Sequence, residues 1–336
     1  MPKLMQAAVI THYKQTSPEI KSVPIPTLQP TDVLVKIKAA SLNPIDLKTM
    51  AGGLRPLLTY DMPLIIGSDF SGEIVAIGSR VTQFQVGDAI YGRPRKTRIG
   101  SFAEYLAIDA QEIALKPSNL SYEEAAAVPL VGLTSYQALH DILKLHPGQK
   151  VLIQAGAGGI GTLAIQLAKR LGATVATTTS AANVDFVRSL GAEQIIDYHT
   201  QNFADLLTNY DAVFDTLGGH ALEQAFSIVK PGGQIVSISG LPDRQFAQEY
   251  GLPRWKQALF GVVTHRLTRL QKQTDTTYHF LFMWPSGAEL ATLARLIEAQ
   301  ELRPIIDRTF PFHELDQALT TLKTGHARGK IVLSLT

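Results

Sequence analysis

The segment AGAGGIG, residues 155–161, carries the clearest chemical signal in the chain. Gly156, Gly158 and Gly161 form a G-x-G-x-x-G pattern, and Gly159 adds a further glycine. Such a turn lets the backbone approach a pyrophosphate without an intervening Cβ atom. A helix that starts at the turn offers unpaired N–H groups and the positive end of its dipole to the same anion. The pattern therefore predicts a dinucleotide-binding site.

The flanking residues fit the strand and the helix that this turn requires. A short apolar run, Val151 to Ile153, precedes the turn, and Gly172 suits the C-cap of the helix that follows. Apolar residues recur between them at the spacing of one helix face: Ile160, Leu163, Ala164, Leu167, Ala168 and Leu171. A glycine pattern alone is weak evidence, whereas one between such a strand and helix favours a nucleotide site over a structural turn.

The end of the next predicted strand indicates which dinucleotide binds. NAD sites usually place an Asp or Glu about 20 residues after the first glycine, but residues 177–180 read TTTS. A carboxylate there would exclude a 2′-phosphate, because two like charges about 4 Å apart cost on the order of 4 kcal/mol at an effective dielectric of about 20. Hydroxyls at Thr178 and Ser180 can instead donate to phosphate oxygens, which favours NADPH. The same residues fit a plain strand, and Ser180 fits the cap of the next helix whichever cofactor binds.

The elements that position this motif indicate two domains. With 336 residues, the chain is long for one core. Residues 1–125 read as short strands separated by turns, as in an open β-barrel. Strands and helices alternate over residues 126–300, which predicts a doubly wound parallel α/β sheet. Residues 301–336 end in a strand that we expect to return to the first domain. The polar, basic segment from Leu241 to Thr276 fits a helical insertion or an oligomer contact.

Composition narrows the classes of partner. The net charge is 31 − 29 = +2 without a basic block, so neither nucleic acid nor a membrane is expected as the main partner. The absence of cysteine removes disulfides and thiolate zinc sites. The N-terminal residues show neither a sustained apolar run nor an Arg-rich transit pattern, so the cytoplasm is the expected compartment.

Two segments of the first domain are candidates for lining a substrate site. SLNPIDLK, residues 41–48, sets Asn43 before a proline, which favours an extended backbone at a strand-to-helix connection. The loop over residues 51–72 carries Tyr60, a candidate hydrogen-bond donor to the substrate. Loops of this length are often functional, although plain linkage fits this one equally well.

Taken together, these segments resemble the medium-chain dehydrogenase/reductase superfamily, in its zinc-free quinone oxidoreductase branch, over essentially the full length. The resemblance is carried by SLNPIDLK, GSDFSGEIVAIGSRVTQFQVGDAIYG, AAAVPLVGLTSYQAL, AGAGGIG, SLGAEQIIDY and GHARGKIVL. It implies a GroES-like catalytic domain built from both chain ends, a Rossmann domain between them, and a homodimer.

The resemblance also implies roles for individual residues. Pyrophosphate binding falls on the glycine turn, including Ile160, and 2′-phosphate recognition on Ser180 and Tyr198. The remaining implied cofactor contacts are Asn43, Thr134, Leu217, Ser239, Gly240, His326, Ala327 and Arg328. A solvated basic turn is an equally good interpretation of Arg328.

The chain departs from zinc-dependent relatives at every metal position. Those relatives carry a cysteine in place of Asn43, a His-Glu pair in place of Ser68 and Asp69, and a four-cysteine lobe near residues 93–100; no metal site is expected here. The resulting hypothesis is NADPH-dependent, metal-free hydride transfer to a quinone or an α,β-unsaturated carbonyl, a small electrophile whose own carbonyl spreads the incoming charge. No side chain is assigned as catalytic. The alternative is an NADPH-binding sensor or structural protein with little turnover.

Overall fold

A computed structural model describes residues 3–335 and divides the chain into two compact units. Unit 1 contains the residues up to Leu133 and those from Trp284 onward, and unit 2 is Thr134–Met283. The domain boundaries expected from the sequence fall after residues 125 and 300, whereas internal contacts divide the chain after residues 133 and 283.

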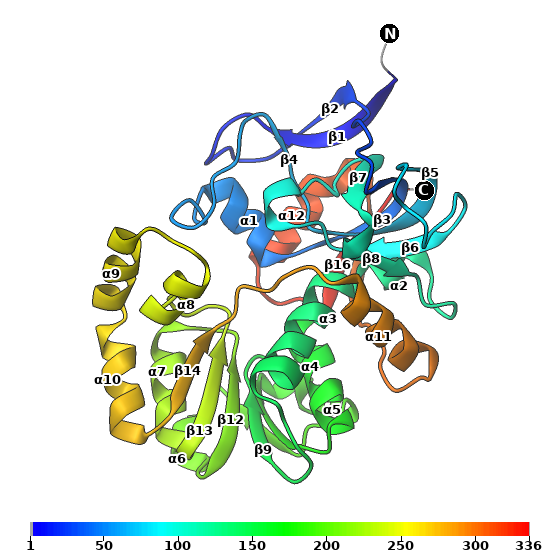
Figure 1. The fold of residues 1–336 in the computed structure, drawn as a ribbon. Coiled ribbons are helices and arrows are strands. Elements are labelled where there is room, and N and C mark those ends of the chain that lie inside the picture. Colours follow the sequence, from blue (N-terminus) through cyan, green and yellow to red (C-terminus); the bar gives the residue numbers. More distant parts are fainter. Residues whose placement is uncertain (1–2, 336) are drawn as a thin grey trace. The chain divides into compact units, whose positions relative to one another are not determined.

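Unit 2 is built on a parallel sheet (Figure 1). Its strands are β9 (Lys150–Ile153), β10 (Thr174–Thr179), β11 (Gln194–Asp197), β12 (Tyr210–Asp215), β13 (Val229–Ser237) and β14 (Thr277–Phe280). They lie in the order β11-β10-β9-β12-β13-β14, and each neighbouring pair is parallel. The predicted doubly wound α/β sheet is thereby confirmed.

The helices of unit 2 follow the strands in alternation. They are α4 (Gly159–Arg170), α5 (Val184–Ser189), α6 (Phe203–Leu206), α7 (Gly219–Ile228), α8 (Arg244–Glu249), α9 (Arg254–Val263) and α10 (His265–Thr274). In α4, the predicted apolar face is buried at Leu163, Ala164, Leu167 and Ala168. The last three helices occupy the segment from Leu241 to Thr276, so this segment is helical, and its role as an insertion or an oligomer contact stays a prediction.

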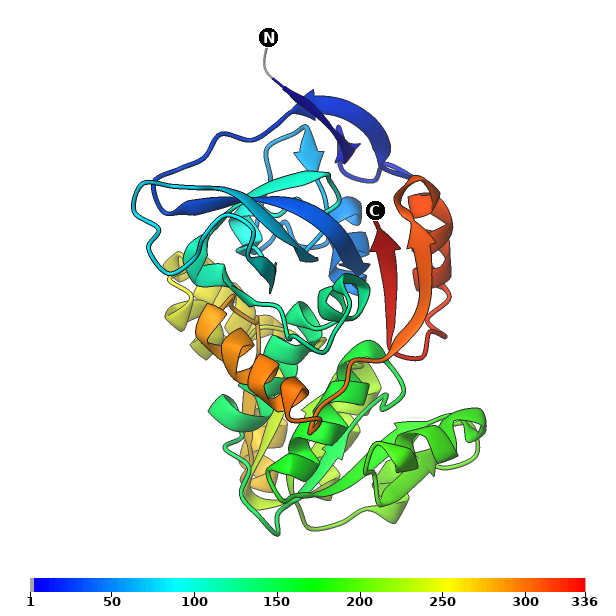
Figure 2. The same cartoon turned by 90° about the vertical axis from the view of Figure 1, so that its right-hand side faces the viewer.

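Unit 1 is predominantly antiparallel. Its larger sheet contains β3 (Asp32–Leu42), β5 (Asp69–Ile77), β6 (Ala89–Gly92), β7 (Tyr105–Asp109), β8 (Ile113–Leu115), β15 (Ile306–Pro311) and β16 (Lys330–Ser334). A smaller sheet has the order β2 (Glu19–Pro24), β1 (Leu4–Ile10), β4 (Leu64–Ile65). Figure 2 shows the red β16 between the orange β15 and the blue β3. Ile331 of β16 pairs antiparallel with Leu42 of β3, which confirms the predicted return of the last strand.

Alternation along β3 explains why this strand lies at the centre of unit 1. Val33, Val35 and Ile37 are almost fully buried in one apolar cluster with residues of β5, β6 and β7. The helices of unit 1 are α1 (Pro44–Ala51), α2 (Tyr122–Ala126), α11 (Gly287–Glu298) and α12 (Leu315–Lys323), while α3 (Pro129–Tyr136) contains the boundary between the units. Over residues 3–335, no helix combines the length and apolar character needed to cross a membrane.

Candidate functional site

The glycine turn joins β9 to α4, and its glycines are required for different structural reasons. A Cβ atom on Gly156 would lie 2.2 Å from Thr177 Oγ1, and one on Gly161 would lie 2.4 Å from the Ala155 carbonyl oxygen. Packing inside unit 2 therefore requires these two glycines. A Cβ on Gly158 would meet only the Ala155 oxygen, at 3.3 Å, so its other side is open. Gly158 is thus the position where the backbone is exposed to the close approach of a phosphate group.

The strand order places this turn at the switch point of the sheet. The chain proceeds from β9 to β10 and β11 on one side, then continues with β12, β13 and β14 on the other. Ligands of open α/β sheets bind outside the carboxyl ends of the strands at such a point. Candidate residues from separate loops follow this same edge: Gly158 after β9, Ser180 after β10, Tyr198 after β11, Leu217 after β12, and Ser239 and Gly240 after β13. Thr134, on α3, is buried.

The proposed 2′-phosphate contacts are brought together by the pairing of β10 with β11. Thr179 pairs with Asp197, so Ser180 and Tyr198 are the next residues on adjacent strands, and the Tyr198 N–H donates to the Thr179 oxygen at 3.2 Å. Tyr198 is 55% exposed. The expected cap by the Ser180 side chain is wrong: Ser180 Oγ makes no bond to a helix N–H and accepts from Asn183 Nδ2 at 3.2 Å.

Thr178 has a different environment from its neighbour. Its side chain is 4% exposed, and its Oγ1 accepts from the Ala155 N–H at 3.0 Å. The hydroxyl therefore supports the glycine turn, in which Ala155 adopts a positive φ of 53°. A direct contact between Thr178 and the cofactor stays a prediction.

Asp215, at the end of β12, is a positioning residue that sequence reasoning missed. Its buried carboxylate accepts from the N–H groups of Leu217 at 3.1 Å and Gly218 at 2.9 Å, and from Ser237 Oγ. Ser237 Oγ in turn accepts from the Gly240 N–H at 2.7 Å. Burial raises the pKa of Asp215 above its usual value. One carboxyl group thereby fixes the loops after β12 and β13; an Asp that ends an apolar strand before two glycines is the signal that could have found it.

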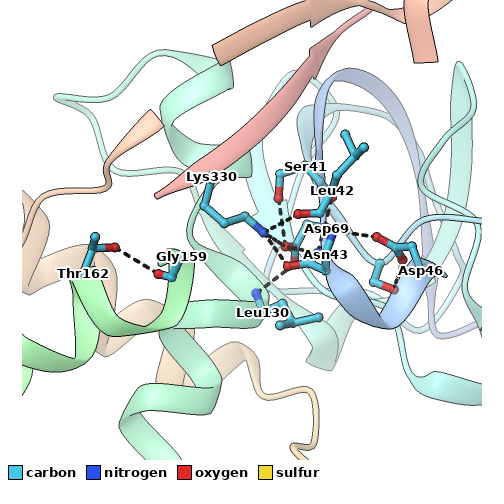
Figure 3. Close-up of polar contacts among 10 residues, drawn as sticks. Ser41, Leu42, Asn43, Asp46, Asp69, Leu130, Gly159, Thr162 and Lys330 are labelled. Atoms are coloured by element: carbon cyan, nitrogen blue, oxygen red, sulfur yellow. Dashed lines mark hydrogen bonds and ion pairs between the residues drawn. The ribbon is translucent and has the colours of Figure 1, made fainter. Parts of the chain in front are cut away.

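Unit 1 contains a buried polar network centred on Lys330 (Figure 3). The Lys330 side chain is 5% exposed, and its Nζ donates to the Leu42 oxygen at 3.0 Å, to Asn43 Oδ1 and to Asp69 Oδ2 at 3.3 Å. Asp69 also accepts from Asn43 Nδ2 at 2.8 Å, Ser41 Oγ at 2.9 Å and the Leu130 N–H at 2.8 Å. Every oxygen of this buried carboxylate is thus bonded.

The network gives Asn43 a structural role that the sequence did not indicate. Its side chain is 1% exposed and uses both ends of the amide, one to accept from Lys330 and the other to donate to Asp69. Asn43 therefore holds β3 to β5 and β16. Its predicted contacts with substrate and cofactor stay predictions.

The positions matched to zinc ligands in zinc-dependent relatives form part of the same network. Asn43, Ser68 and Asp69 supply an amide, a hydroxyl and one carboxylate, and the carboxylate already neutralises a lysine ammonium. Zinc in proteins is bound by thiolate, imidazole and carboxylate groups. These residues do not fit a zinc ion.

Asp46, at the start of α1, lies beside the network and has an unusual protonation. Its Oδ2 accepts from the Asn43 N–H at 2.8 Å, and its Oδ1 accepts from Ser68 Oγ at 2.9 Å. Burial raises the pKa of Asp46 to about 7, and the charge of Asp69 adds to this effect, while the two hydrogen bonds and Lys330 oppose it. The carboxyl group therefore loses its proton near neutral pH and not near pH 3.8.

We expect Asp46 to make the protein less stable as pH rises. Its pKa is raised from 3.8 to about 7 on folding, so between these values the folded state binds a proton that the unfolded state has released. Folding stability conferred by this proton is lost as pH rises through this interval, by at most about 4 kcal/mol. Asp46→Asn mimics the protonated carboxyl at both pH values. Urea unfolding at pH 5 and pH 7.5 should therefore show that the free energy of unfolding of the variant, relative to that of the native protein, is higher at pH 7.5 than at pH 5. Equal pH dependence of the two proteins contradicts the assignment.

Tyr60 can act as a hydrogen-bond donor at neutral pH. Burial raises the pKa of its phenol to about 12, although the nearby Arg93 guanidinium opposes the shift. Its main-chain N–H donates to Tyr13 Oη at 2.8 Å, which anchors this part of the loop. The phenol thus keeps its proton, and its contact with a substrate stays a prediction.

The last candidate contacts lie on the turn between α12 and β16. His326 and Arg328 are exposed and Ala327 is partly buried. The Arg328 N–H donates to Asp307 Oδ1 at 3.0 Å, which holds the backbone of the turn and leaves the role of the guanidinium a prediction.

Comparisons with known proteins agree with these observations. Residues 29–118 match the model for the alcohol dehydrogenase GroES-like domain, and residues 190–333 match that for zinc-binding dehydrogenases. The chain is 33% identical to the mitochondrial NAD(P)H oxidoreductase RTN4IP1 of Danio rerio, over 94% of this chain and 87% of the relative. It is 32% identical to the chloroplastic NADPH-dependent alkenal/one oxidoreductase of Arabidopsis thaliana, over 99% of this chain and 80% of the relative.

A solved structure supports the same assignment over the whole chain. The quinone oxidoreductase from Coxiella burnetii is 35% identical and superposes with a TM-score of 0.85, covering 99% of this chain and 100% of that one. The chain therefore belongs to the medium-chain dehydrogenase/reductase superfamily, in the quinone oxidoreductase branch, and is an oxidoreductase that uses a nicotinamide cofactor.

Proposed function

We propose that this oxidoreductase uses NADPH to reduce quinones or α,β-unsaturated carbonyl compounds, without a metal. The observation that carries the proposal is the Lys330–Asn43–Asp69 network, in which an amide and a carboxylate stand at metal-ligand positions of zinc-dependent relatives and are bonded to the Lys330 ammonium. The chain's similarity to proteins named as an alkenal/one oxidoreductase and a quinone oxidoreductase supports the same substrate class.

In such a reaction the residues of the chain bind the cofactor and orient the acceptor. When bound, the reduced nicotinamide supplies a hydride, and one proton from solvent or a hydroxyl group completes the two-electron reduction. A conjugated acceptor spreads the incoming negative charge over its own carbonyl, so it needs no Lewis acid. The protein holds the cofactor phosphates at the glycine turn and orients the acceptor. Tyr60, protonated at neutral pH, is suited to donate a hydrogen bond to the acceptor oxygen.

A substrate panel tests the activity. NADPH oxidation, followed at 340 nm with a set of quinones, enones, enals and saturated aldehydes or ketones, should be accelerated by the conjugated acceptors. Preincubation with a zinc chelator should leave the rates unchanged. If NADPH binds but no acceptor accelerates its oxidation, the alternative of an NADPH-binding sensor or structural protein is favoured instead. Stoichiometric zinc in the active protein contradicts the metal-free mechanism.

The preference for NADPH rests on the end of β10. Ser180 and the adjacent Tyr198 offer hydroxyls, and residues 177–180 contain no carboxylate. We expect Ser180→Asp to weaken NADPH binding by about 100-fold or more, because its carboxylate would repel the 2′-phosphate by on the order of 4 kcal/mol at about 4 Å. Affinity for NADH, which lacks this phosphate, should change by less than about threefold.

A matched control separates this effect from a general change in charge. Ser227→Asp adds the same charge near the end of α7, before β13 begins, and so at the opposite edge of the sheet. Titrations that follow nicotinamide fluorescence should show unchanged affinity for both cofactors. A native protein that prefers NADH, or equal losses for both cofactors in Ser180→Asp, contradicts the proposal.

We further propose a homodimer, which the family resemblance implies, and a cytoplasmic location, which is the compartment expected from the sequence. Light scattering on the purified protein and fractionation of the source cells test these two points.

A further inference from the structure

Helix α9 and the residues around it form the most unusual surface of unit 2. Residues 250–274, which include α9 and α10, contain no Asp or Glu. The same segment carries five basic residues: Arg254, Lys256, Arg266, Arg269 and Lys272. The whole chain has nearly balanced charge, so this segment is a local concentration that the net charge of +2 conceals.

The apolar side of α9 faces outward. Trp255, Leu259, Val262 and Val263 are 66%, 50%, 69% and 46% exposed. Their spacing of i, i+4, i+7 and i+8 places them on one side of the helix, which we call the α9 stripe. Phe260, outside this stripe, is buried. An amphipathic helix usually buries such a stripe, and contiguous exposed apolar side chains typically mark an interaction site.

Basic residues border the α9 stripe. Arg254 and Lys256 flank Trp255 in sequence, and at about 100° per residue they project on either side of the stripe. Lys256 Nζ lies 5.6 Å from the centroid of the Trp255 ring. Helix α10 follows α9 directly along one side of unit 2 (Figure 1) and exposes Arg269 and Lys272. Arg266 is neutralised locally by Glu223 at 2.7 Å.

This combination matches one class of partner. An apolar stripe bordered by basic residues, on a segment that itself contains no acidic residue, complements a membrane surface that presents acyl chains beneath anionic headgroups. A second copy related by a two-fold axis would bring the same basic residues together. Nucleic acid would leave the apolar stripe without a partner. We propose that α9 docks on anionic membrane surfaces, with the stripe at the headgroup–acyl boundary and Arg254, Lys256, Arg269 and Lys272 at the lipid phosphates.

The proposal concerns where the protein lies and does not depend on the hydride-transfer reaction. It departs from the expectation, drawn from the overall charge, that no membrane is a main partner. Because binding to vesicles is measured without cofactor or substrate, its outcome is independent of the enzymatic assays above.

Trp255 provides a direct reporter of docking, because the chain has only two tryptophans. In Trp284→Phe, Trp255 is the remaining fluorophore. Its emission should shift to the blue on vesicles of phosphatidylcholine with about one-third phosphatidylglycerol, and lipids brominated on the acyl chain should quench it. In Trp255→Phe, Trp284 should show neither effect. Vesicles of phosphatidylcholine alone should bind much more weakly.

Substitutions around α9 test the two parts of the surface separately. The variant Arg254→Gln/Lys256→Gln should lower the partition coefficient on anionic vesicles by about 30-fold, at about 1 kcal/mol for each basic residue. Leu259→Ser/Val262→Ser should lower it by at least about tenfold. The controls are Lys3→Gln/Lys323→Gln, which removes two exposed charges in unit 1, and Leu206→Ser, which changes a 49% exposed leucine on α6. Both controls should bind as the native protein does.

Two results would overturn the proposal. One is the absence of vesicle binding, or equal binding by the α9 variants and the controls. The other is a blue shift of Trp255 that depends on protein concentration without vesicles and disappears in Leu259→Ser/Val262→Ser together with self-association in light scattering. That outcome assigns the stripe to a second copy of the chain.

Discussion

Replacing Lys330 with methionine is expected to lower the free energy of unfolding by about 3–5 kcal/mol. The substitution keeps much of the side-chain volume and removes the ammonium group that neutralises Asp69. Asp69 is fully buried, so its carboxylate would then lack a counter-charge in a medium that solvates it poorly. Urea unfolding of the native protein and Lys330→Met measures the loss.

A second variant separates the loss of pairing from the loss of packing. Lys330→Met/Asp69→Asn removes both charges while the amide still accepts from the Leu130 N–H, so we expect it to recover much of the stability. Lys323→Met is the matched control, since Lys323 is exposed on α12 and should change stability by less than about 0.5 kcal/mol. A double variant as unstable as Lys330→Met, or a Lys330→Met as stable as the control, contradicts this account of the network.

Gly158→Ala is expected to weaken NADPH binding by about 5- to 150-fold, the equivalent of about 1–3 kcal/mol for an intruding methyl group. Folding should be nearly unaffected, because Gly158 has φ −77° and ψ 172°, which alanine adopts readily, and its Cβ would meet only the Ala155 oxygen at 3.3 Å. Nicotinamide fluorescence titrations measure the affinity, and thermal unfolding without cofactor measures the stability.

Gly161→Ala is the matched substitution three residues later, with the opposite expected result. Its Cβ would lie 2.4 Å from the Ala155 oxygen and 2.6 Å from the Gly156 Cα, so the turn itself must shift and the apo protein should lose stability. If Gly158→Ala binds NADPH as tightly as the native protein, the pyrophosphate does not approach the backbone at Gly158. Equal destabilisation by both substitutions means that both glycines serve packing alone.

The parts of the fold that depend on local sequence could be predicted. The glycine turn, the apolar period of α4 and the alternation in β3 each involve residues close in sequence, and the structure has all three elements. The side chain of Ser180 could not be predicted in the same way. A short 3-10 turn over Ala181–Asn183 precedes α5, so the helix begins later than a simple N-cap pattern indicates.

The side-chain contacts of the polar network could not be predicted from the sequence. Asn43 reads locally as a residue of a strand-to-helix connection, and its extended backbone and helix start are as expected. Its side chain, however, is committed by Lys330, which lies 287 residues away, and by Asp69 on β5. Such pairings depend on the register of β3 against β16 and β5, which no local pattern encodes. The exposure of the α9 stripe could not be predicted for a related reason, because helical spacing alone does not say which side of a helix is covered.

The pairing of β16 with β3 has a consequence for biosynthesis. Unit 2 is continuous in sequence, so a ribosome delivers it complete once Met283 has emerged, and it can fold while translation proceeds. Unit 1 cannot complete its larger sheet until the end of the chain has been synthesised. Residues 39–42 of β3 have an unpaired edge until residues 331–334 are made, and Asp69 lacks its cation until Lys330 is made. The nascent chain therefore carries an open, apolar strand edge through most of its synthesis, a period in which chaperone protection matters most.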